Sequence, residues 1–82
     1  MYTRMQIQLD TQQKILSFIS IISQQNDTFI IEDGNSEARA NASSMLGVLY
    51  ASGDYGDQMY LVNKTNNGYF PNELEQFRVN RE

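Results

Sequence analysis

The residues best placed to do chemistry are two adjacent serines, Ser43 and Ser44, which stand directly before a short apolar run. Free hydroxyls satisfy the unpaired backbone N–H groups at a helix start, so the sequence predicts a short helix over residues 44–51. A serine hydroxyl can also be covalently modified. Both serines are therefore modifiable hydroxyls as well as candidate helix caps.

The apolar run that follows the serines is too dense for one narrow core-facing stripe. Met45, Leu46 and Leu49 spread around the expected helix, so part of this apolar surface should face solvent. Exposed apolar area beside a modifiable hydroxyl is a plausible docking surface for a partner protein. A simpler interpretation stays open, in which the serines only cap the helix and the apolar side chains only pack.

Composition limits the classes of function that the chain can serve. Its 82 residues make one small domain over residues 1–82, with room for one core but not for an enclosed active site. The net charge is −4 and the six Lys and Arg residues are dispersed, which disfavours direct nucleic-acid binding. No segment resembles a signal peptide or a membrane span, so a cytoplasmic location and no membrane partner are expected.

The chain contains no histidine and no cysteine. This composition removes the usual general base, the thiol nucleophile and the commonest metal ligands. Acidic pairs such as Asp54 with Asp57, or Glu73 with Glu75, are typical of solvated surface charge. Neither pair has the spacing of a calcium loop. We therefore expect no catalytic residue, no metal site and no cofactor.

The first half of the chain predicts three strands and a helix. Residues 5–9 alternate apolar and polar side chains, as does a strand with one buried face. Asp10 and Thr11 can each cap the amphipathic helix expected over residues 12–25, whose apolar stripe is Ile15, Phe18, Ile19 and Ile22. Strands are expected over residues 28–32 and 37–42. In the latter, small inward residues would let a helix approach: Ala38, Ala40 and Ala42.

The second half adds the serine-capped helix, a strand over residues 58–62 and a last helix that starts near Pro71 and ends near Val79. On the last helix, Phe70, Leu74 and Phe77 share one face. The expected order is strand, helix, strand, strand, helix, strand, helix. Such an order favours an α+β fold of two layers, with three helices on one face of a mostly antiparallel four-stranded sheet.

Residues 40–49, Ala-Asn-Ala-Ser-Ser-Met-Leu-Gly-Val-Leu, resemble the regulatory region of HPr, the small phosphocarrier of the bacterial sugar phosphotransferase system. In that family the region reads approximately Val-Asn-Ala-Lys-Ser-Ile-Met-Gly-Val-Met. Five residues match in place, and three others are conservative replacements. The matching residues are Asn41, Ala42, Ser44, Gly47 and Val48. The resemblance implies an HPr-like open-faced sandwich, consistent with the length and element order of the whole chain.

The second HPr motif, Gly-Ile-His-Ala-Arg-Pro, is absent from this chain. Thr11, Gln12 and Gln13 occupy the corresponding region, which makes it a degenerate phosphohistidine site. Neither Gln nor Thr forms a high-energy N–P bond, and the carboxylate of Asp10 would repel a phosphoryl group there. The resemblance thus points to a histidine-lacking, Crh-like member of the family that cannot relay phosphate.

The resemblance implies that regulation is the role that remains. In gram-positive relatives a dedicated kinase phosphorylates the serine that matches Ser44, and the product binds a transcription regulator of carbon catabolite repression. By this resemblance Met45, Leu46 and Leu49 would contact a protein partner, either that regulator or HPr kinase. Ser43 replaces the family's lysine, so a kinase that reads the lysine could pass over this chain. Two adjacent hydroxyls also leave open whether Ser44 or Ser43 is the regulatory phosphorylation site that the resemblance implies.

Two interpretations of the function therefore stand. One is a non-catalytic regulatory module that docks a partner through the Ser44 helix. The other is a diverged scaffold or oligomerisation domain, such as a homodimer, in which Ser44 only caps. For that alternative, exposed tyrosines would supply interface contacts: Tyr50, Tyr55, Tyr60 and Tyr69.

Overall fold

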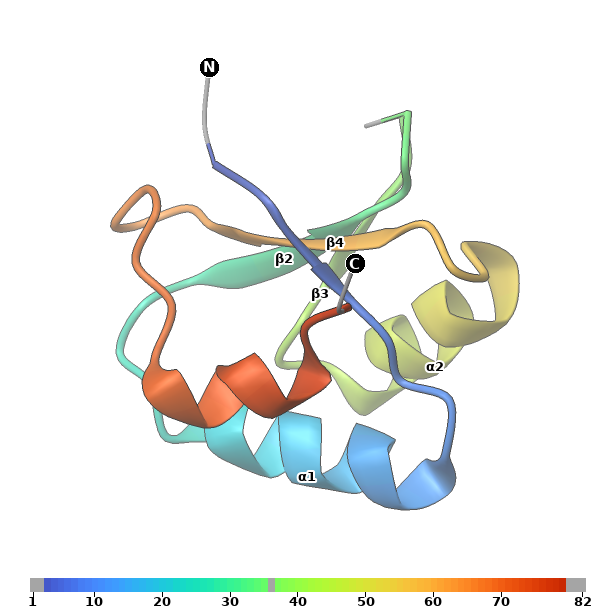
Figure 1. The fold of residues 1–82 in the computed structure, drawn as a ribbon, viewed down its shortest axis with the longest axis horizontal. Helices are drawn as coiled ribbons and strands as arrows, with labels where there is room; N and C mark the ends of the chain where they lie inside the picture. Colours follow the sequence, from blue (N-terminus) through green and yellow to red (C-terminus); the bar gives the residue numbers. More distant parts are fainter. Residues whose placement is uncertain (1–2, 36, 80–82) are drawn as a thin grey trace.

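The computed structural model describes residues 3–35 and 37–79, and it contains the seven elements that the sequence predicts, in the predicted order (Figure 1). Three of the elements are helical and four are strands. In chain order they are β1 (Met5–Ile7), α1 (Gln12–Ser23), β2 (Phe29–Glu32), β3 (Arg39–Asn41), α2 (Met45–Asp54), β4 (Met59–Asn63) and the 3₁₀ helix η1 (Asn72–Phe77).

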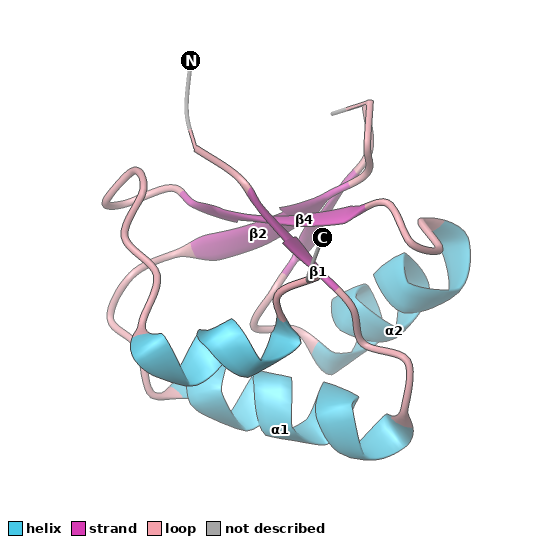
Figure 2. Cartoon of the chain, viewed as in Figure 1, coloured by secondary structure: helices cyan, strands magenta, loops and turns pink. Residues whose placement is uncertain are grey.

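The strands form one antiparallel sheet in the order β1-β4-β2-β3. Figure 2 shows the helices together on one side of this sheet, so the expected α+β arrangement of two layers is confirmed. Alternation along each strand sends one set of side chains toward the helices and the other set toward the open face. In β2, for example, Phe29 and Ile31 point into the core, while Ile30 and Glu32 lie on the open face.

The core lies between the sheet and the helices. The predicted stripe of α1 supplies three buried side chains, Ile15, Phe18 and Ile22, whereas Ile19 is partly buried at the margin. Phe18 is fully buried and meets the ring of Phe77 edge to face, with 5.5 Å between ring centroids. Burial of such a side chain contributes about 1.5–3 kcal/mol to folding, so this contact holds η1 against α1.

The small residues of the third strand region lie where the sequence predicts. Ala40 and Ala42 are buried and Ala38 packs against the core margin. Because these side chains end at Cβ, helix α2 can pack directly on β3. The strand itself is shorter than predicted, since ladder pairing covers only Arg39–Asn41.

Several element ends differ from the prediction. Helix α1 ends at Ser23 rather than residue 25, β1 ends at Ile7 although Leu9 is still buried, and α2 continues to Asp54 rather than residue 51. Sequence patterns do not fix these ends, because terminal turns depend on tertiary neighbours.

The last helix is a 3₁₀ helix that ends at Phe77, two residues before the predicted end. Beyond it the chain becomes extended and pairs with β1. The backbone N–H of Gln8 donates to Phe77 O at 2.8 Å, and that of Val79 donates to Gln6 O at 2.9 Å. These strand-like bonds compete with further helical turns, so the helix stops early.

The expectation of four exposed tyrosines is wrong for two of them. Tyr55 is buried against the core, with only 6% of its surface exposed. Tyr60 is half-buried, because the guanidinium of Arg4 lies 4.2 Å from its ring centroid. Tyr50 and Tyr69 are exposed as expected.

Within the described ranges, no helix combines the length and the apolar character needed to cross a membrane.

Candidate functional site

Helix α2 begins at Met45 because Ser44 caps it. The Ser44 side chain accepts a hydrogen bond from the backbone N–H of Gly47 at 3.1 Å, and its carbonyl accepts from Val48 N–H at 2.9 Å. The Ser44 backbone is extended, with φ −101° and ψ 123°, as is usual for an N-cap. The predicted capping role is therefore confirmed for Ser44 and is wrong for Ser43, whose hydroxyl donates to Asn41 and accepts no helix N–H.

The turn before the helix is fixed by Asn41. Its side-chain oxygen accepts from both the backbone N–H of Ser43 at 2.9 Å and the Ser43 hydroxyl at 2.8 Å. The Asn41 carbonyl also accepts from Ser44 N–H at 3.2 Å. As a result the two serine hydroxyls have different surroundings, since Ser43 is exposed and donates whereas Ser44 is partly buried and accepts.

Gly47 allows α2 to lie this close to β3. A Cβ atom built at this glycine would lie 2.9 Å from the carbonyl oxygen of Asn41, closer than real Cβ contacts come. The absence of a side chain therefore sets the distance between the first turn of α2 and the end of β3. The same close approach places the Asn41 turn directly beside the first turn of α2.

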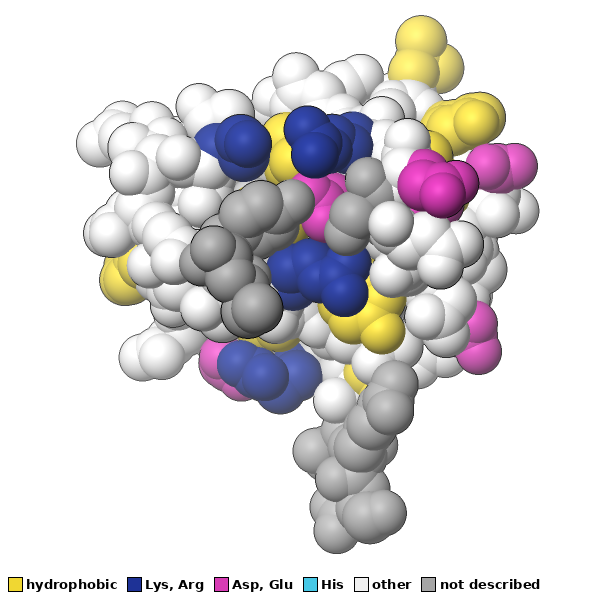
Figure 3. Space-filling model, turned by 90° about the horizontal axis from the view of Figure 1, so that it is seen from above, with side chains coloured by type: hydrophobic (Ala, Val, Ile, Leu, Met, Phe, Trp, Pro, Cys, Tyr) yellow, Lys and Arg dark blue, Asp and Glu magenta, His cyan; other side chains and the backbone are white. Residues whose placement is uncertain are grey.

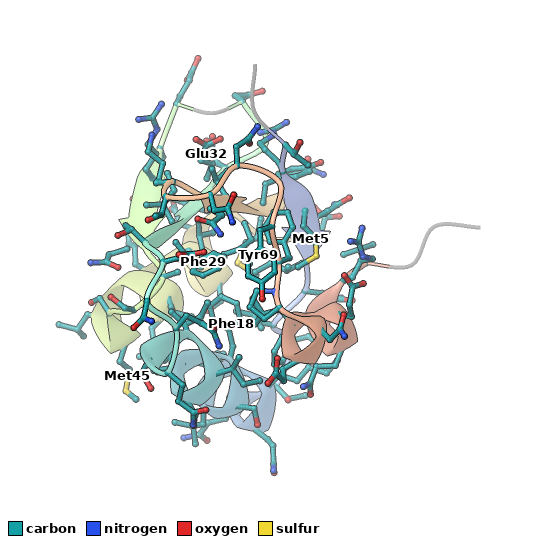
Figure 4. All side chains as sticks on the ribbon, turned by 90° about the vertical axis from the view of Figure 1, so that its left-hand side faces the viewer. Met5, Phe18, Phe29, Glu32, Met45 and Tyr69 are labelled. Atoms are coloured by element: carbon teal, nitrogen blue, oxygen red, sulfur yellow. The ribbon has the colours of Figure 1, made fainter. Side chains whose placement is uncertain are left out.

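The outward face of α2 is apolar. Met45 and Leu49 are each a little under half exposed, Tyr50 is 58% exposed, and Leu46 is 80% exposed. In contrast, Val48 and Ala51 carry the contact with the core. In Figure 4 the labelled Met45 side chain points away from the sheet.

This exposure agrees with the prediction that part of the run faces solvent. We call Met45, Leu46, Leu49 and Tyr50 the α2 face. Leu16 of α1, the neighbouring helix, is also about half exposed. The structure describes no other chain against this surface, so its role in docking stays a prediction.

Residues 11–13, which the resemblance predicts to be a degenerate phosphohistidine region, lie at the start of helix α1. Thr11 is the N-cap, and its hydroxyl accepts from Lys14 N–H at 3.1 Å. Gln12 and Gln13 are exposed and line a shallow pocket of about 300 Å³ with Leu16 and Ser17. None of these side chains is an ionisable group or an activated nucleophile.

The charge at this helix start is negative but paired. The carboxylate of Asp10 lies 3.0 Å from the ammonium group of Lys14. The hydrogen bond from Lys14 holds the pKa of Asp10 below its ordinary value. Asp10 is therefore ionised at neutral pH and places a negative charge near the end of the helix that attracts phosphate in other proteins.

The acidic pairs behave as surface charge. Asp54 and Asp57 are exposed, and so is Glu73. Glu75 pairs with Arg78 at 2.7 Å, and this hydrogen bond lowers the pKa of Glu75. In residues 3–35 and 37–79, no group of three or more acidic, histidine or cysteine side chains could hold a metal ion.

Sequence reasoning missed one charged cluster, on the open face of the sheet. Glu32 is fully buried, and its carboxylate lies between Arg4 at 3.7 Å and Arg39 at 3.5 Å. Figure 3 views this face and shows Lys and Arg side chains around acidic atoms; Figure 4 labels Glu32 above the sheet. Only the strand register brings these residues together, so no spacing in the sequence could have revealed them.

Comparisons of this chain with protein-family models, with curated proteins and with solved structures found no match.

Proposed function

We propose that this chain is a non-catalytic, HPr-like regulatory module, which docks a protein partner through the α2 face and is controlled by phosphorylation at the start of that helix. The observation that carries the proposal is the α2 face itself. Four large apolar side chains are exposed together on one short helix, directly after two serine hydroxyls. Exposed apolar area of this kind is typical of interaction sites.

Hydrogen bonding favours Ser44 over Ser43 as the phosphorylated residue. The Ser44 oxygen already accepts a bond from the N–H of Gly47, and phosphate oxygens are stronger acceptors at the same place. The Ser43 hydroxyl donates its proton to Asn41, and esterification would remove that donor. The first turn of α2 contains no acidic residue that would repel the added charge.

The start of α1 supports a regulatory role for this chain and argues against a role in phosphate relay. Thr11, Gln12 and Gln13 offer no imidazole, and Asp10 adds a carboxylate to the same helix end. The element order and the helices on one sheet face are compatible with the HPr-like sandwich that the proposal assumes. The proposed partner is the transcription regulator that binds serine-phosphorylated HPr relatives, with HPr kinase as the modifying enzyme.

Intact-mass analysis after incubation with ATP and an HPr kinase tests the modification. We expect one added phosphate on the unchanged chain and on Ser43→Ala, and none on Ser44→Ala. A true HPr in a parallel reaction shows that the kinase is active. No phosphate on this chain while true HPr reacts would overturn phosphorylation control.

Binding of the phosphorylated chain to the catabolite-repression regulator, measured by calorimetry, tests docking. Leu46→Gln should abolish binding without loss of the fold, because this side chain is 80% exposed. Tyr69→Gln is the matched control, since Tyr69 is exposed but lies outside α2. Equal loss in both variants, or none in Leu46→Gln, would contradict docking through the α2 face.

The second candidate function is a scaffold that self-associates, and the same exposed face favours it. Two copies could bury their α2 faces against each other, with Tyr50 at the contact. Sedimentation over a range of concentrations distinguishes the two functions. A dimer that Leu46→Asp converts to monomer supports the scaffold, and a monomer at all concentrations supports the regulatory module.

A further inference from the structure

A second pocket lies at the opposite end of α2 from the serines. It has a volume of about 410 Å³ and is formed by the turn after β2, the last turn of α2 and the loop into β4. Figure 1 shows the turn after β2 and the yellow end of α2 on the right-hand side of the molecule. Its lining residues are Asp33, Gly34, Asn35, Asp54, Tyr55 and Gln58.

Tyr55 supplies this pocket with a polar group that has no partner. The residue is 6% exposed, and its hydroxyl, closed off from solvent, makes no hydrogen bond with any described residue. Burial raises the pKa of Tyr55, and Tyr50, Asp33 and Asp54 raise it further, so the hydroxyl is neutral. Buried polar groups nearly always have a hydrogen-bond partner in native proteins, so this hydroxyl is free to bond a ligand or a water.

The charges around that hydroxyl are negative. Asp33 uses one carboxylate oxygen to accept from the backbone N–H groups of Glu37 and Ala38, which leaves the other oxygen for a ligand. Asp54 is the last residue of α2, at the negative end of the helix dipole, and the last turn contains no basic residue. Among the described residues that line the pocket, none is Lys or Arg.

These features select a cation with N–H donors. Among the described residues, no group of three or more acidic, histidine or cysteine side chains could hold a divalent metal. An ammonium group needs only charge and three acceptors. We propose that this pocket binds a primary alkylammonium group, with Asp33 and Asp54 as its charge partners and the Tyr55 hydroxyl as a hydrogen-bond acceptor.

Because the Tyr55 hydroxyl has no exposed surface, the proposal requires that lining side chains shift as the ammonium group enters. Such rotamer changes are rapid for exposed residues. The pocket shares no described lining residue with the α2 face, although the ring of Tyr50 meets that of Tyr55 edge to face. This inference does not depend on the proposed function.

Amide chemical shifts of the ¹⁵N-labelled full chain test the binding, with n-propylammonium as the probe. At concentrations up to about 10 mM, above the Kd of a weak millimolar site, we expect saturable shifts at Gly34, Asp54 and Tyr55. Tetramethylammonium has the same charge but no N–H donor, and it should leave these amides unchanged. Equal shifts from both cations, or no saturable shift from propylammonium, would overturn the proposal.

Variants of the pocket provide the second test. Asp54→Asn should weaken propylammonium binding about tenfold, as expected for loss of a charge-assisted hydrogen bond, and Tyr55→Phe should weaken it several-fold. Glu73→Gln removes the same charge from an exposed residue outside the pocket, and it should leave the Kd unchanged. Equal weakening by Glu73→Gln and Asp54→Asn would show general charge attraction and overturn the site.

Two further probes distinguish the source of the ammonium group. The diamine putrescine represents a free metabolite, and the tripeptide Gly-Lys-Gly with blocked ends represents a lysine side chain of a protein. Tighter binding of putrescine supports a small-molecule site. Tighter binding of the peptide supports recognition of a partner's lysine.

Discussion

The carboxylate of Glu32 lies 3.7 Å from the guanidinium of Arg4, and it is fully buried although the described helices all lie on the other face of the sheet. Arg4 also lies over the ring of Tyr60, and Arg39 approaches Glu32 from the other side at 3.5 Å. Arg4 and Arg39 thus pair with a buried carboxylate on the open face of the sheet. Their charges offset part of the desolvation of that carboxylate.

Removal of Arg4 should therefore destabilise the fold more than removal of Arg39. We expect Arg4→Ala to cost about 1–3 kcal/mol, because it weakens the pairing of a buried charge and removes the contact with Tyr60. Arg39 is half exposed, so Arg39→Ala should cost less. Urea unfolding at neutral pH measures both, and a larger cost for Arg39→Ala would contradict this account.

Two glycines of α2 give opposite predictions for the same substitution. Gly53→Ala places its Cβ in open space, so it should stabilise the helix by about 0.5–1 kcal/mol. Gly47→Ala gains the same helix propensity but forces its Cβ against the carbonyl of Asn41, so it should destabilise. Thermal unfolding of the two variants checks the sign. Stabilisation by Gly47→Ala would show that α2 can move away from β3 at little cost.

The two serines should also differ when each is replaced by alanine. Ser44→Ala removes the N-cap hydrogen bond to Gly47, and we expect a loss of about 1 kcal/mol. Ser43→Ala removes one exposed hydrogen bond to Asn41, whose side chain still accepts from the backbone, so the loss should stay within about 0.5 kcal/mol. Chemical denaturation resolves this difference. Equal losses would mean that the Asn41 turn, and not the Ser44 cap, starts the helix.

Tyr55→Phe should stabilise the unliganded chain, since it removes a buried hydroxyl without a partner while it keeps the ring. The expected gain is about 1 kcal/mol, at the lower end of the cost of such a group. An ordered water on the hydroxyl would instead make the substitution neutral or destabilising. Differential scanning calorimetry in amine-free buffer gives the sign.

Alkaline pH provides a separate test of the same residue. Burial raises the pKa of Tyr55 above its ordinary value of 10.0, so the folded chain holds this proton more tightly than the unfolded chain. Its contribution to stability is complete below the unfolded pKa and is lost as pH rises through the folded pKa. Stability should thus fall above about pH 10 in the unchanged chain and fall less in Tyr55→Phe. Parallel pH profiles would contradict the shift.

The sequence predicts a structural element correctly where a single local pattern determines that element. The stripe of α1, the alternating alanines before α2 and the cap at Ser44 each follow from spacing along the chain, and all three are present. The exposure of Leu46 follows from the same reasoning, because α2 has more apolar residues than one core contact can bury.

The errors arise where distant segments meet. Tyr55 follows a helix in a polar segment, which suggests exposure, yet the core and the ring of Tyr50 surround it. Glu32 is the last residue of the apolar strand β2. Only the pairing of β2 with its neighbours places an arginine beside the Glu32 carboxylate. The type of the last helix depends on the segment after Phe77, which pairs with β1.

The pairing of the segment after Phe77 with β1 should protect the sheet from self-aggregation. The segment around Arg78 covers the outer edge of β1, so those backbone groups are not free to recruit a strand from another molecule. At the far edge, β3 is only three residues long and includes the charged Arg39, both of which discourage such recruitment. A chain shortened to end before Arg78 should therefore keep most of its core yet become prone to fibril-like association through the uncovered β1.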